Sequence, residues 1–297
     1  MPSKQELLKE EVKGKIKEIH KQSFEIYGAV KIEKLLKKSS YKTSLKTVSN
    51  YMSEMDIKAR YIKKYIVTTK DSDFGTHLAN ILDREYNPSN PNELWCTDIT
   101  YIWTKSGFVY LTSVMDLFSK KIIFWVISNS LDSKAVVKCI EKAKKRRNLS
   151  NPVIIHCDRG IQYVSRKYYE VLGEQLIPSY SRKANRWDNA CIESFHALIK
   201  REWIQFYDIQ NITHAKAIVF EYIETFYNTV RIHGSCDYKS PTMYEKQHRL
   251  NKDLKNKYRL GSSIENKGTI NLTYPFSWHS TKLQSSQLRD LNLIYLS

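Results

Sequence analysis

The chain has 297 residues, of which 41% are hydrophobic, and its formal net charge is +17 at pH 7. This length can bury two modest cores, and only 9 Gly and 7 Pro argue against a turn-rich all-β protein. The longest apolar runs are too short to cross a bilayer, and no segment near Met1 resembles a signal peptide. We therefore expect a cytoplasmic protein with no membrane partner, and the charge indicates a polyanion such as nucleic acid.

The cysteines are scattered and form no CxxC pair, which is typical of small core residues in a reducing compartment. A zinc site would need clustered Cys and His ligands, and the sequence has no such cluster in its first 70 residues.

Residues 1–66 predict a small helical DNA-binding domain. Apolar residues at helical spacing indicate a helix over about 4–22, a short second helix, and a third that starts near the N-cap residue Ser44. A turn before a third short helix fits a helix-turn-helix, although a plain three-helix bundle gives the same pattern. Residues 1–70 hold 17 Lys or Arg against 8 Asp or Glu, which favours DNA binding. The third helix would then present its polar face to the major groove, with Lys46, Thr47, Ser49 and Asn50.

Residues 67–91 predict a basic linker that ends in an Asn- and Pro-rich loop. From there to residue 250 the pattern changes to short β-prone runs and helices. We expect strands over 94–103, 108–115, 122–127, 153–157 and 177–180, and helices over 133–147, 165–174, 187–206 and 213–228. Three antiparallel strands followed by alternating helix and strand describe an α/β, ribonuclease H-like core with a mixed five-stranded sheet.

Residues 251–297 predict a C-terminal extension of unknown role. Most of it has the character of a poorly ordered chain end. Its aromatic-rich piece, Leu272 to Trp278, is too apolar for a solvated tail, so we expect that piece to dock on the catalytic core.

Three acids stand in positions that suggest chemistry. Asp158 follows the apolar run Val153 to Cys157, and Asp98 lies inside an apolar strand, where a lone carboxylate is costly. Glu193 lies on the long helix that follows. Each has an ordinary reading, such as a turn bond or a solvated helix position, but together they would repel one another unless a divalent metal joined them. Asp116, by contrast, is explained by hydrogen bonding in a turn.

The helix carrying Glu193 supplies a further pattern. At 100° per residue its polar positions form one stripe that we interpret as facing DNA: Arg186, Asn189, Glu193, His196, Ala197 and Lys200.

An ordered set of motifs resembles a known family. The segments are Trp95 to Tyr101, Asp116 to Ser119, His156 to Tyr163, Ser181 to Lys183, Asp188 to Phe195, and Phe226 to Pro241. They are similar to bacterial insertion-sequence transposases with a retroviral-integrase-like (DDE) catalytic core. More narrowly, they resemble the second-frame product of the group that encodes transposase in two overlapping reading frames. Residues 27–65 resemble that family's helix-turn-helix.

The resemblance implies DNA cleavage and strand transfer at insertion-sequence ends. Asp98, Asp158 and Glu193 would be the catalytic acids and would hold two Mg²⁺, with Mn²⁺ as a possible substitute. Arg182, Lys183 and Lys200 would neutralise phosphates. It also implies double-stranded DNA as partner, a homo-oligomer on DNA, association or fusion with a first-frame protein, and a bacterial, nucleoid-associated location.

Two departures from the family pattern concern the region around these residues. The separation of Asp158 from Glu193 is 35 positions, one shorter than the group's usual spacing, and Ala184 stands where the group usually has Gly.

Two other functions remain open from the residues alone. A tyrosine recombinase would use the HxxR motif at His156 and Arg159 with Tyr180 as nucleophile, but it would leave Asp98 and Glu193 unexplained. A catalytically inactive regulator would use residues 1–66 for binding and carry a dead core.

Overall fold

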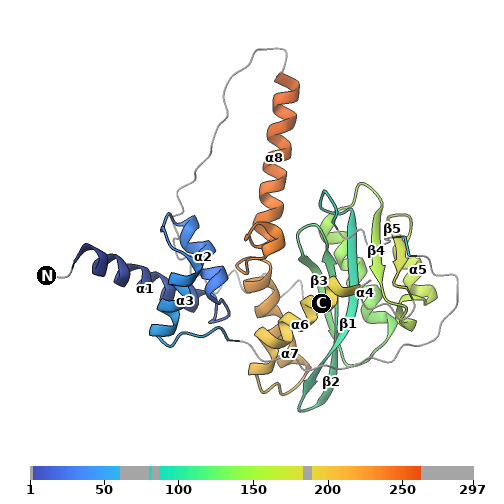
Figure 1. Ribbon diagram of the computed structural model, residues 1–297. Coiled ribbons are helices and arrows are strands. Elements are labelled where there is room, and N and C mark those ends of the chain that lie inside the picture. Colours follow the sequence, from blue (N-terminus) through green and yellow to red (C-terminus); the bar gives the residue numbers. More distant parts are fainter. Residues whose placement is uncertain (1–2, 61–79, 82–86, 183–188, 262–297) are drawn as a thin grey trace, which may run out of the picture. The chain divides into compact units, whose positions relative to one another are not determined.

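The computed structural model describes residues 3–60, 80–81, 87–182 and 189–261 (Figure 1). Residues 1–259 form one compact unit. Within the described ranges, no helix is both long and apolar enough to cross a membrane. The predicted docking segment Leu272 to Trp278 lies outside the described residues.

Three short helices open the chain, as the sequence predicts. They are α1 (Lys4–Gln22), α2 (Ala29–Lys38) and α3 (Leu45–Glu54). The hydroxyl of Ser44 accepts a hydrogen bond from the Thr47 backbone N–H, so Ser44 is the N-cap of α3. The side chains that form the shared core are Val12, Ile16, Ile32, Leu36, Val48 and Met52.

The apolar stripes of these helices are shorter than their spacing suggests. The helical spacing predicts that Leu8, Val30 and Leu45 lie on the apolar faces of the three helices, yet all three are exposed. Val30 and Leu45 stand at the beginnings of their helices and Leu8 in the second turn of α1. The helical pattern therefore identifies the buried face but not how far along each helix the core extends.

A five-stranded mixed sheet forms the centre of the second part of the chain (Figure 1). Its strands are β1 (Leu94–Thr104), β2 (Gly107–Asp116), β3 (Lys121–Ser128), β4 (Val153–Cys157) and β5 (Leu176–Tyr180), in the order β3-β2-β1-β4-β5. The first three pair antiparallel, whereas β4 pairs parallel to β1 and β5 parallel to β4. This arrangement is the predicted ribonuclease H-like core.

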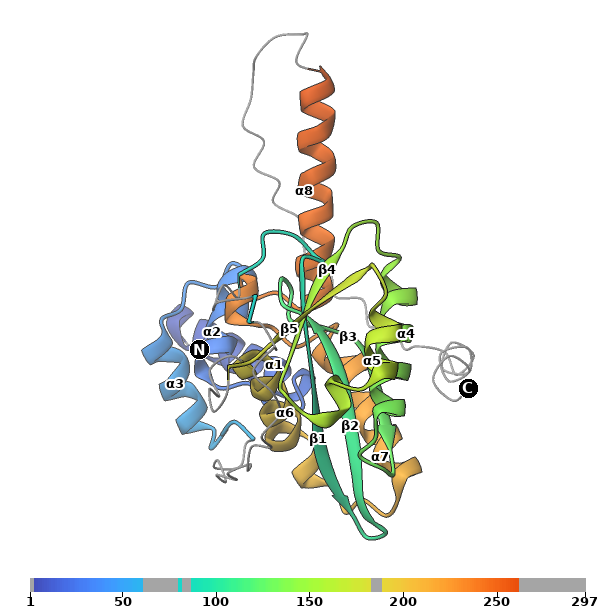
Figure 2. The ribbon, with the colours of Figure 1, turned by 90° about the vertical axis from the view of Figure 1, so that its right-hand side faces the viewer.

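Helices cover both faces of the sheet, as the two views in Figures 1 and 2 show. The helices α4 (Ser133–Arg147) and α5 (Arg166–Leu172) lie on one face, and α6 (Ala190–Glu202) and α7 (Ile212–Phe220) lie on the other. Neighbouring residues of β3 reflect this division, because side chains alternate along a strand. Phe124 lies under Arg146 of α4, while the indole of Trp125 donates to Glu224, just beyond α7.

Shorter turns and one long helix complete the described elements. They are the 3-10 helices Ile161–Tyr163, Ile204–Phe206 and Gly234–Cys236, the π-helix Glu221–Tyr227, and α8 (Pro241–Gly261). The helix predicted over 213–228 is therefore present, but its second half is wound as a π-helix.

The long helix predicted over 187–206 is shorter in the structure. The helix α6 ends at Glu202, and the backbone of Trp203 leaves the helical region at φ −137° before the 3-10 turn. Arg231 makes a bidentate ion pair with Glu202, with N–O distances of 2.6 and 2.7 Å, and both side chains are buried. Glu202 at the end of α6 therefore has a structural role, because it is buried and paired with Arg231. Residues 187 and 188 lie outside the described ranges.

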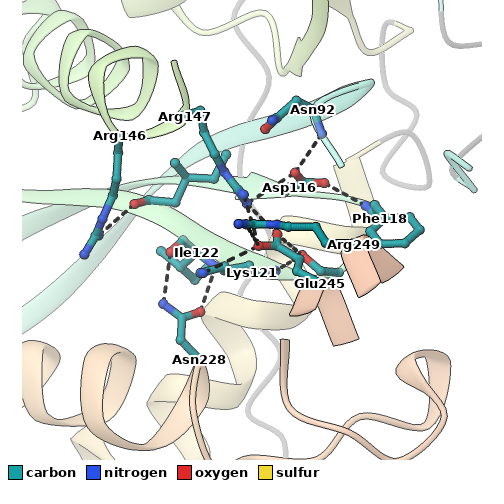
Figure 3. Close-up of polar contacts among 12 residues, drawn as sticks. Asn92, Asp116, Phe118, Lys121, Ile122, Arg146, Arg147, Asn228, Glu245 and Arg249 are labelled. Carbon is teal, nitrogen blue, oxygen red and sulfur yellow. Dashed lines mark hydrogen bonds and ion pairs between the residues drawn. The ribbon is translucent and has the colours of Figure 1, made fainter. Parts of the chain in front are cut away.

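A buried charge cluster attaches the start of α8 to the sheet (Figure 3). Arg147 donates two hydrogen bonds to Glu245, at 3.0 and 2.6 Å, and lies 3.3 Å from Asp116. Ser119 donates to Glu245, and Lys121 lies 3.5 Å from the same carboxylate. Because Arg147 bonds mainly to Glu245, the pKa values of the two acids move in opposite directions.

Burial raises the pKa of Asp116 to about 6, and Arg147 offsets this only in part. For Glu245, burial also raises the pKa, but hydrogen bonds and the charge of Arg147 outweigh burial and hold the pKa below its usual value. One guanidinium therefore stabilises two buried carboxylates.

Replacing Arg147 with Met should lower the free energy of unfolding by about 3–5 kcal/mol, because it leaves buried carboxylates without their cation. Arg147 is only 8% exposed in this cluster, and Glu245 is 1% exposed. The measurement is chemical denaturation of the full chain. Arg166→Met is the matched control, since Arg166 pairs with Glu170 at the surface, and it should leave stability nearly unchanged. Equal stability of the two variants would contradict a central role for the cluster.

Candidate active site

The sheet register brings Asp98 and Asp158 to the same level on neighbouring strands. The last parallel pair between β1 and β4 joins Cys96 to His156. Asp98 lies two residues further along β1, and Asp158 lies two residues after His156, directly past the end of β4 at Cys157. Adjacent strands are about 4.8 Å apart, so the two acids are neighbours where β4 ends, beside the middle of β1. Both residues are partly buried.

The buried phenol of Tyr163 is affected by the charges of both acids. Tyr163 is 1% exposed, and burial, followed by the negative charges of Asp98 and Asp158, raises the pKa of its phenol. Its hydroxyl lies 3.4 Å from that of Thr97, the residue before Asp98. Because Thr97 and Asp98 project from opposite faces of β1, Tyr163 packs behind the strand that carries Asp98.

A histidine on α6, which packs against the sheet, contacts the carboxylate of Asp98. Nδ1 of His196, on α6, lies 3.2 Å from Oδ2 of Asp98, and Nε2 lies 3.3 Å from the hydroxyl of Ser113. Ser113 is also the cross-strand partner of Asp98 in the β1–β2 hairpin. A carboxylate only accepts hydrogen bonds, so Nδ1 must donate, and in a neutral ring Nε2 then accepts from Ser113. Ser113, His196 and Asp98 form a continuous chain of hydrogen bonds.

Asp158 is positioned by the turn that follows β4. Its Oδ1 accepts a hydrogen bond of 2.9 Å from the Gly160 backbone N–H. A Cβ atom at position 160 would lie 3.0 Å from this same oxygen and from Oε1 of Gln162. The glycine that follows the acid in the sequence is therefore needed for close approach of the backbone to the carboxylate.

Glu193 lies in the first turn of α6 and is exposed. It precedes His196 by three residues, so both side chains are on the same face of the helix, about 4.5 Å apart along its axis. His196 contacts Asp98, which orients this face of α6 toward the β1 acid. In the described part of the chain, however, no three His, Cys, Asp or Glu side chains are grouped closely enough to hold a metal ion.

The donor set nonetheless suits a hard divalent cation. Asp98, Asp158 and Glu193 offer carboxylate oxygens, which are the ligands that Mg²⁺ prefers, and none is a soft thiolate or thioether. Asp98 and Asp158 are close enough for both charges to act on Tyr163. A cation would relieve the repulsion between them.

Asp116 does not belong to this set. It is fully buried at the end of β2, where it accepts hydrogen bonds from the backbone N–H groups of Asn92 and Phe118 and pairs with Arg147. The interpretation of Asp116 as a turn-bonded residue is confirmed by the bond from Phe118.

The stripe of α6 that we interpreted as facing DNA is only partly exposed. His196 is buried because it points at Asp98, and Asn189 is 5% exposed with an Oδ1 atom that has no hydrogen-bond partner among the described residues. Lys200 lies further along the helix, with its ammonium 4.2 Å from the ring centroid of Tyr101. Burial lowers the pKa of Lys200, and the charge of Asp98 partly offsets that effect.

The other predicted phosphate-binding residues lie around the preceding loop. Arg182 is exposed at the end of the described segment, while Lys183 and Arg186 lie outside the described residues. On α3, the predicted base-reading face is accessible: Lys46, Ser49 and Asn50 are exposed, and Thr47 is partly exposed.

Two residues of the tyrosine-recombinase alternative are buried. The Tyr180 hydroxyl donates to the Tyr163 carbonyl and contacts the Tyr169 hydroxyl, and burial raises the pKa of Tyr180. His156 is 1% exposed between the hydroxyls of Ser179 and Ser181. A buried phenol with a raised pKa is a poor nucleophile.

Sequence reasoning missed Ser113 and Tyr163 and misplaced His196. A signal for Ser113 was present, because a tight turn after Thr104 fixes the register of β1 against β2 and puts residue 113 opposite residue 98. The direction in which His196 points depends on how α6 packs on the sheet, and no local pattern carries that information.

Comparisons with known proteins agree with this organisation. Family models described as "Integrase core domain" match residues 88–186 and 174–241, and one described as "HTH-like domain" matches residues 7–65. The transposase for insertion sequence element IS904 of Lactococcus lactis subsp. lactis (strain IL1403) is 36% identical over 246 residues, which cover 82% of this chain and 97% of that protein. The transposase InsF for insertion sequence IS3A of Escherichia coli (strain K12) is 33% identical over 220 residues, covering 74% and 76%.

The similarity to solved structures is weaker. The catalytic core domain of HTLV-2 integrase in complex with magnesium is 17% identical, with a TM-score of 0.40, and the match covers 53% of this chain and 98% of that chain. A chain of the simian T-cell lymphotropic virus intasome in complex with a PP2A regulatory subunit is 13% identical, with a TM-score of 0.44, covering 88% and 80%.

Proposed function

Because the chain belongs to the family of insertion-sequence transposases, we propose that it cleaves the ends of an insertion sequence and joins them to new DNA by metal-dependent phosphoryl transfer. The family and the integrase core make it a DDE-type polynucleotidyl transferase. The observation that best supports the reaction is the register of β1 against β4, which sets Asp98 beside Asp158.

In this proposal Asp98, Asp158 and Glu193 hold two Mg²⁺, and Mn²⁺ can replace them. Bound there, the ions would activate the attacking oxygen and stabilise the leaving 3′ oxygen. Closure of the site needs Glu193 to approach the two strand-borne acids. Its place on the helix face that already contacts Asp98 through His196 supports that approach.

The remaining groups position the DNA. Water cleaves a phosphodiester and frees a 3′-OH at the element end, and that hydroxyl then attacks a second phosphodiester, so no protein nucleophile is required. Lys200, Arg182, Lys183 and Arg186 would neutralise the phosphates around these steps, and Asn189 would bond to the DNA. Since Asn189 is buried, this contact requires local movement at the start of α6.

The domain organisation belongs to the same proposal. Residues 1–66 would bind the terminal repeat as a helix-turn-helix, 67–91 would link the domains, 92–250 would be the catalytic core, and 251–297 would be an extension. The DNA partner is double-stranded, the working form is a homo-oligomer on DNA, and a first-frame protein would associate or be fused. The reaction would take place at the bacterial nucleoid.

Asp98→Asn, Asp158→Asn and Glu193→Gln should each abolish Mg²⁺-dependent cleavage of DNA that carries the element ends, while binding of that DNA stays near the wild-type level. Each variant removes one ligand charge without changing side-chain size. Cleavage is followed on labelled DNA, and Glu170→Gln, an exposed acid on α5, is the control that should keep activity. Wild-type cleavage by any of the three variants would refute the assignment, and an inactive wild type that still binds end DNA would favour a regulator.

Substitutions of His196 should separate positioning of Asp98 from a general packing role. The side-chain nitrogen of Asn can replace Nδ1, which contacts Asp98, whereas that of Gln can replace Nε2, which contacts Ser113. His196→Asn should therefore keep Mn²⁺ affinity within a few-fold, while His196→Gln should lose roughly 10- to 100-fold, the usual cost of removing a partner of a metal ligand. Calorimetric Mn²⁺ titration measures both, and melting temperature checks folding. If Gln preserves affinity better than Asn, His196 does not position Asp98.

Replacing Lys46 and Asn50 with Ala should weaken binding to end DNA more than binding to random DNA, because both side chains are exposed on α3. Each lost base contact should cost about 1–3 kcal/mol of discrimination. Fluorescence anisotropy with matched duplexes measures the difference, and Lys17→Ala on the exposed face of α1 is the control. Equal loss on both duplexes would mean phosphate contact without base reading.

A further inference from the structure

Three large aromatic side chains are exposed together on one face of the β1–β2 hairpin. Tyr101 is 43% exposed, Trp103 64% and Phe108 50%. Trp103 and Phe108 are directly opposite each other across the hairpin, and Tyr101 lies on the same face two residues before Trp103. We call these three residues the aromatic platform.

The rings are arranged in contact. Phe108 lies between the other two, with its centroid 4.8 Å from that of Trp103 and 5.5 Å from that of Tyr101, both edge to face. Such pairs favour each other beyond simple burial of area. The rings therefore support one another and present a shared apolar surface to solvent.

The exposure of these three rings is not needed for the hairpin to fold. The opposite face of the hairpin supplies the buried residues Ile102 and Val109. The tip is held by backbone hydrogen bonds, from Lys105 N–H to the Ile209 carbonyl and from Ser106 N–H to the Gln210 carbonyl. The buried face and the tip hold the hairpin in place without the platform. A contiguous exposed apolar surface of this kind marks an interaction site.

The platform lies near the candidate active site but on the other face of β1. Tyr101 follows Asp98 by three residues, about 10 Å along the strand, and because side chains alternate along a strand the ring and the carboxylate project from opposite faces. Lys200 connects the two places, because its ammonium lies 4.2 Å from the Tyr101 ring centroid and the charge of Asp98 acts on it. Lys200 therefore links the platform to Asp98 around β1, and a DNA strand that approaches Asp98 past Lys200 also passes the platform.

We propose that the aromatic platform stacks unpaired bases of the DNA strand adjoining the phosphodiester to be cut. This inference rests on the proposed function, which brings a DNA strand to Asp98. Exposed aromatic rings beside a cation are the combination that binds single-stranded nucleic acid, because every base has a π-face and every phosphate a negative charge.

Charge favours this occupant over a second copy of the chain. Two copies that met through the platform would bring their Lys200 ammonium groups together, and each chain carries a net charge of +17. A polyanionic strand is attracted by the same charges. Paired duplex bases are stacked inside the helix, so the platform selects unpaired bases over duplex.

The test uses the full chain and two DNA probes, a fluorescent oligothymidine of about 15 nucleotides and a duplex of the same length. Trp103→Leu removes the largest ring but keeps an apolar side chain, and Trp103→Phe keeps an aromatic ring. Tyr169→Leu is the matched control, because Tyr169 is 43% exposed but lies on α5. Dissociation constants come from anisotropy, and sedimentation velocity without DNA gives the oligomeric state.

Trp103→Leu should weaken oligothymidine binding roughly tenfold, as expected for the loss of one stacked base, with little change for the duplex. Trp103→Phe should restore most of the affinity, and Tyr169→Leu should bind both probes as wild type does. Equal weakening for both probes, or unchanged oligothymidine binding, would overturn the proposal. A changed sedimentation coefficient with unchanged oligothymidine binding would assign the platform to a second copy instead.

Asp98→Asn distinguishes this inference from the proposed function. Loss of cleavage with wild-type oligothymidine binding supports both. If Asp98→Asn still cleaves, the catalytic role of Asp98 is wrong. The effect of Trp103→Leu on single-strand binding would then still support the platform independently.

Discussion

The parallel pairing of β1 with β4 is the constraint on which the rest of the structure depends. It sets Asp98, within β1, beside Asp158, which directly follows β4, and each acid comes two residues after the last paired residues Cys96 and His156. In α/β sheets the carboxyl ends of parallel strands are the places where ligands bind, because the backbone leaves the sheet there and side chains become accessible. His196 of α6 then orients the carboxylate of Asp98, and the backbone N–H of Gly160 orients that of Asp158.

Two groups of acids in the described part of the chain differ in how their negative charge is compensated. Around Asp116 and Glu245, the guanidinium of Arg147 neutralises the charge and the side chains are inaccessible. Asp98 instead contacts the imidazole of His196, which in its neutral form orients a carboxylate without cancelling its charge. The first cluster attaches α8 to the sheet, and the second leaves negative charge at a partly accessible edge. A site for divalent cations needs the second arrangement.

Local rules account for much of what the sequence predicted. The Ser44 cap and the spacing of Val48 and Met52 define α3 without any knowledge of the rest of the chain. The strand bounds follow from β-prone runs between turns, and the order of strands and helices identifies the ribonuclease H-like core. Asp98 could be selected because a lone carboxylate inside an apolar strand is costly. Asp158 and Glu193 could be selected only together with it, because three converging acids would repel one another without a divalent metal.

Long-range packing accounts for what the sequence did not predict. The apolar residues Trp203, Ile204 and Phe206 continue the helical pattern of α6, so the local sequence does not indicate that the helix ends at Glu202. The ion pair that Glu202 makes there comes from Arg231, 29 positions further along the chain. A helical wheel groups His196 with residues that face DNA, but it cannot show that this side chain reaches across to Asp98. The exposure of Trp103 likewise depends on which helices cover which face of the sheet.

The central claim is that Asp98 and Asp158 bind the same metal ion, and a double-mutant cycle of Mn²⁺ affinity tests it most directly. Mn²⁺ binding to the wild type, Asp98→Asn, Asp158→Asn and the double variant can be followed by electron paramagnetic resonance. If one ion needs both carboxylates, each single variant loses most of the affinity and the double variant loses little more, so the effects are strongly non-additive. Losses that add independently, or single variants that bind Mn²⁺ as the wild type does, would contradict the account.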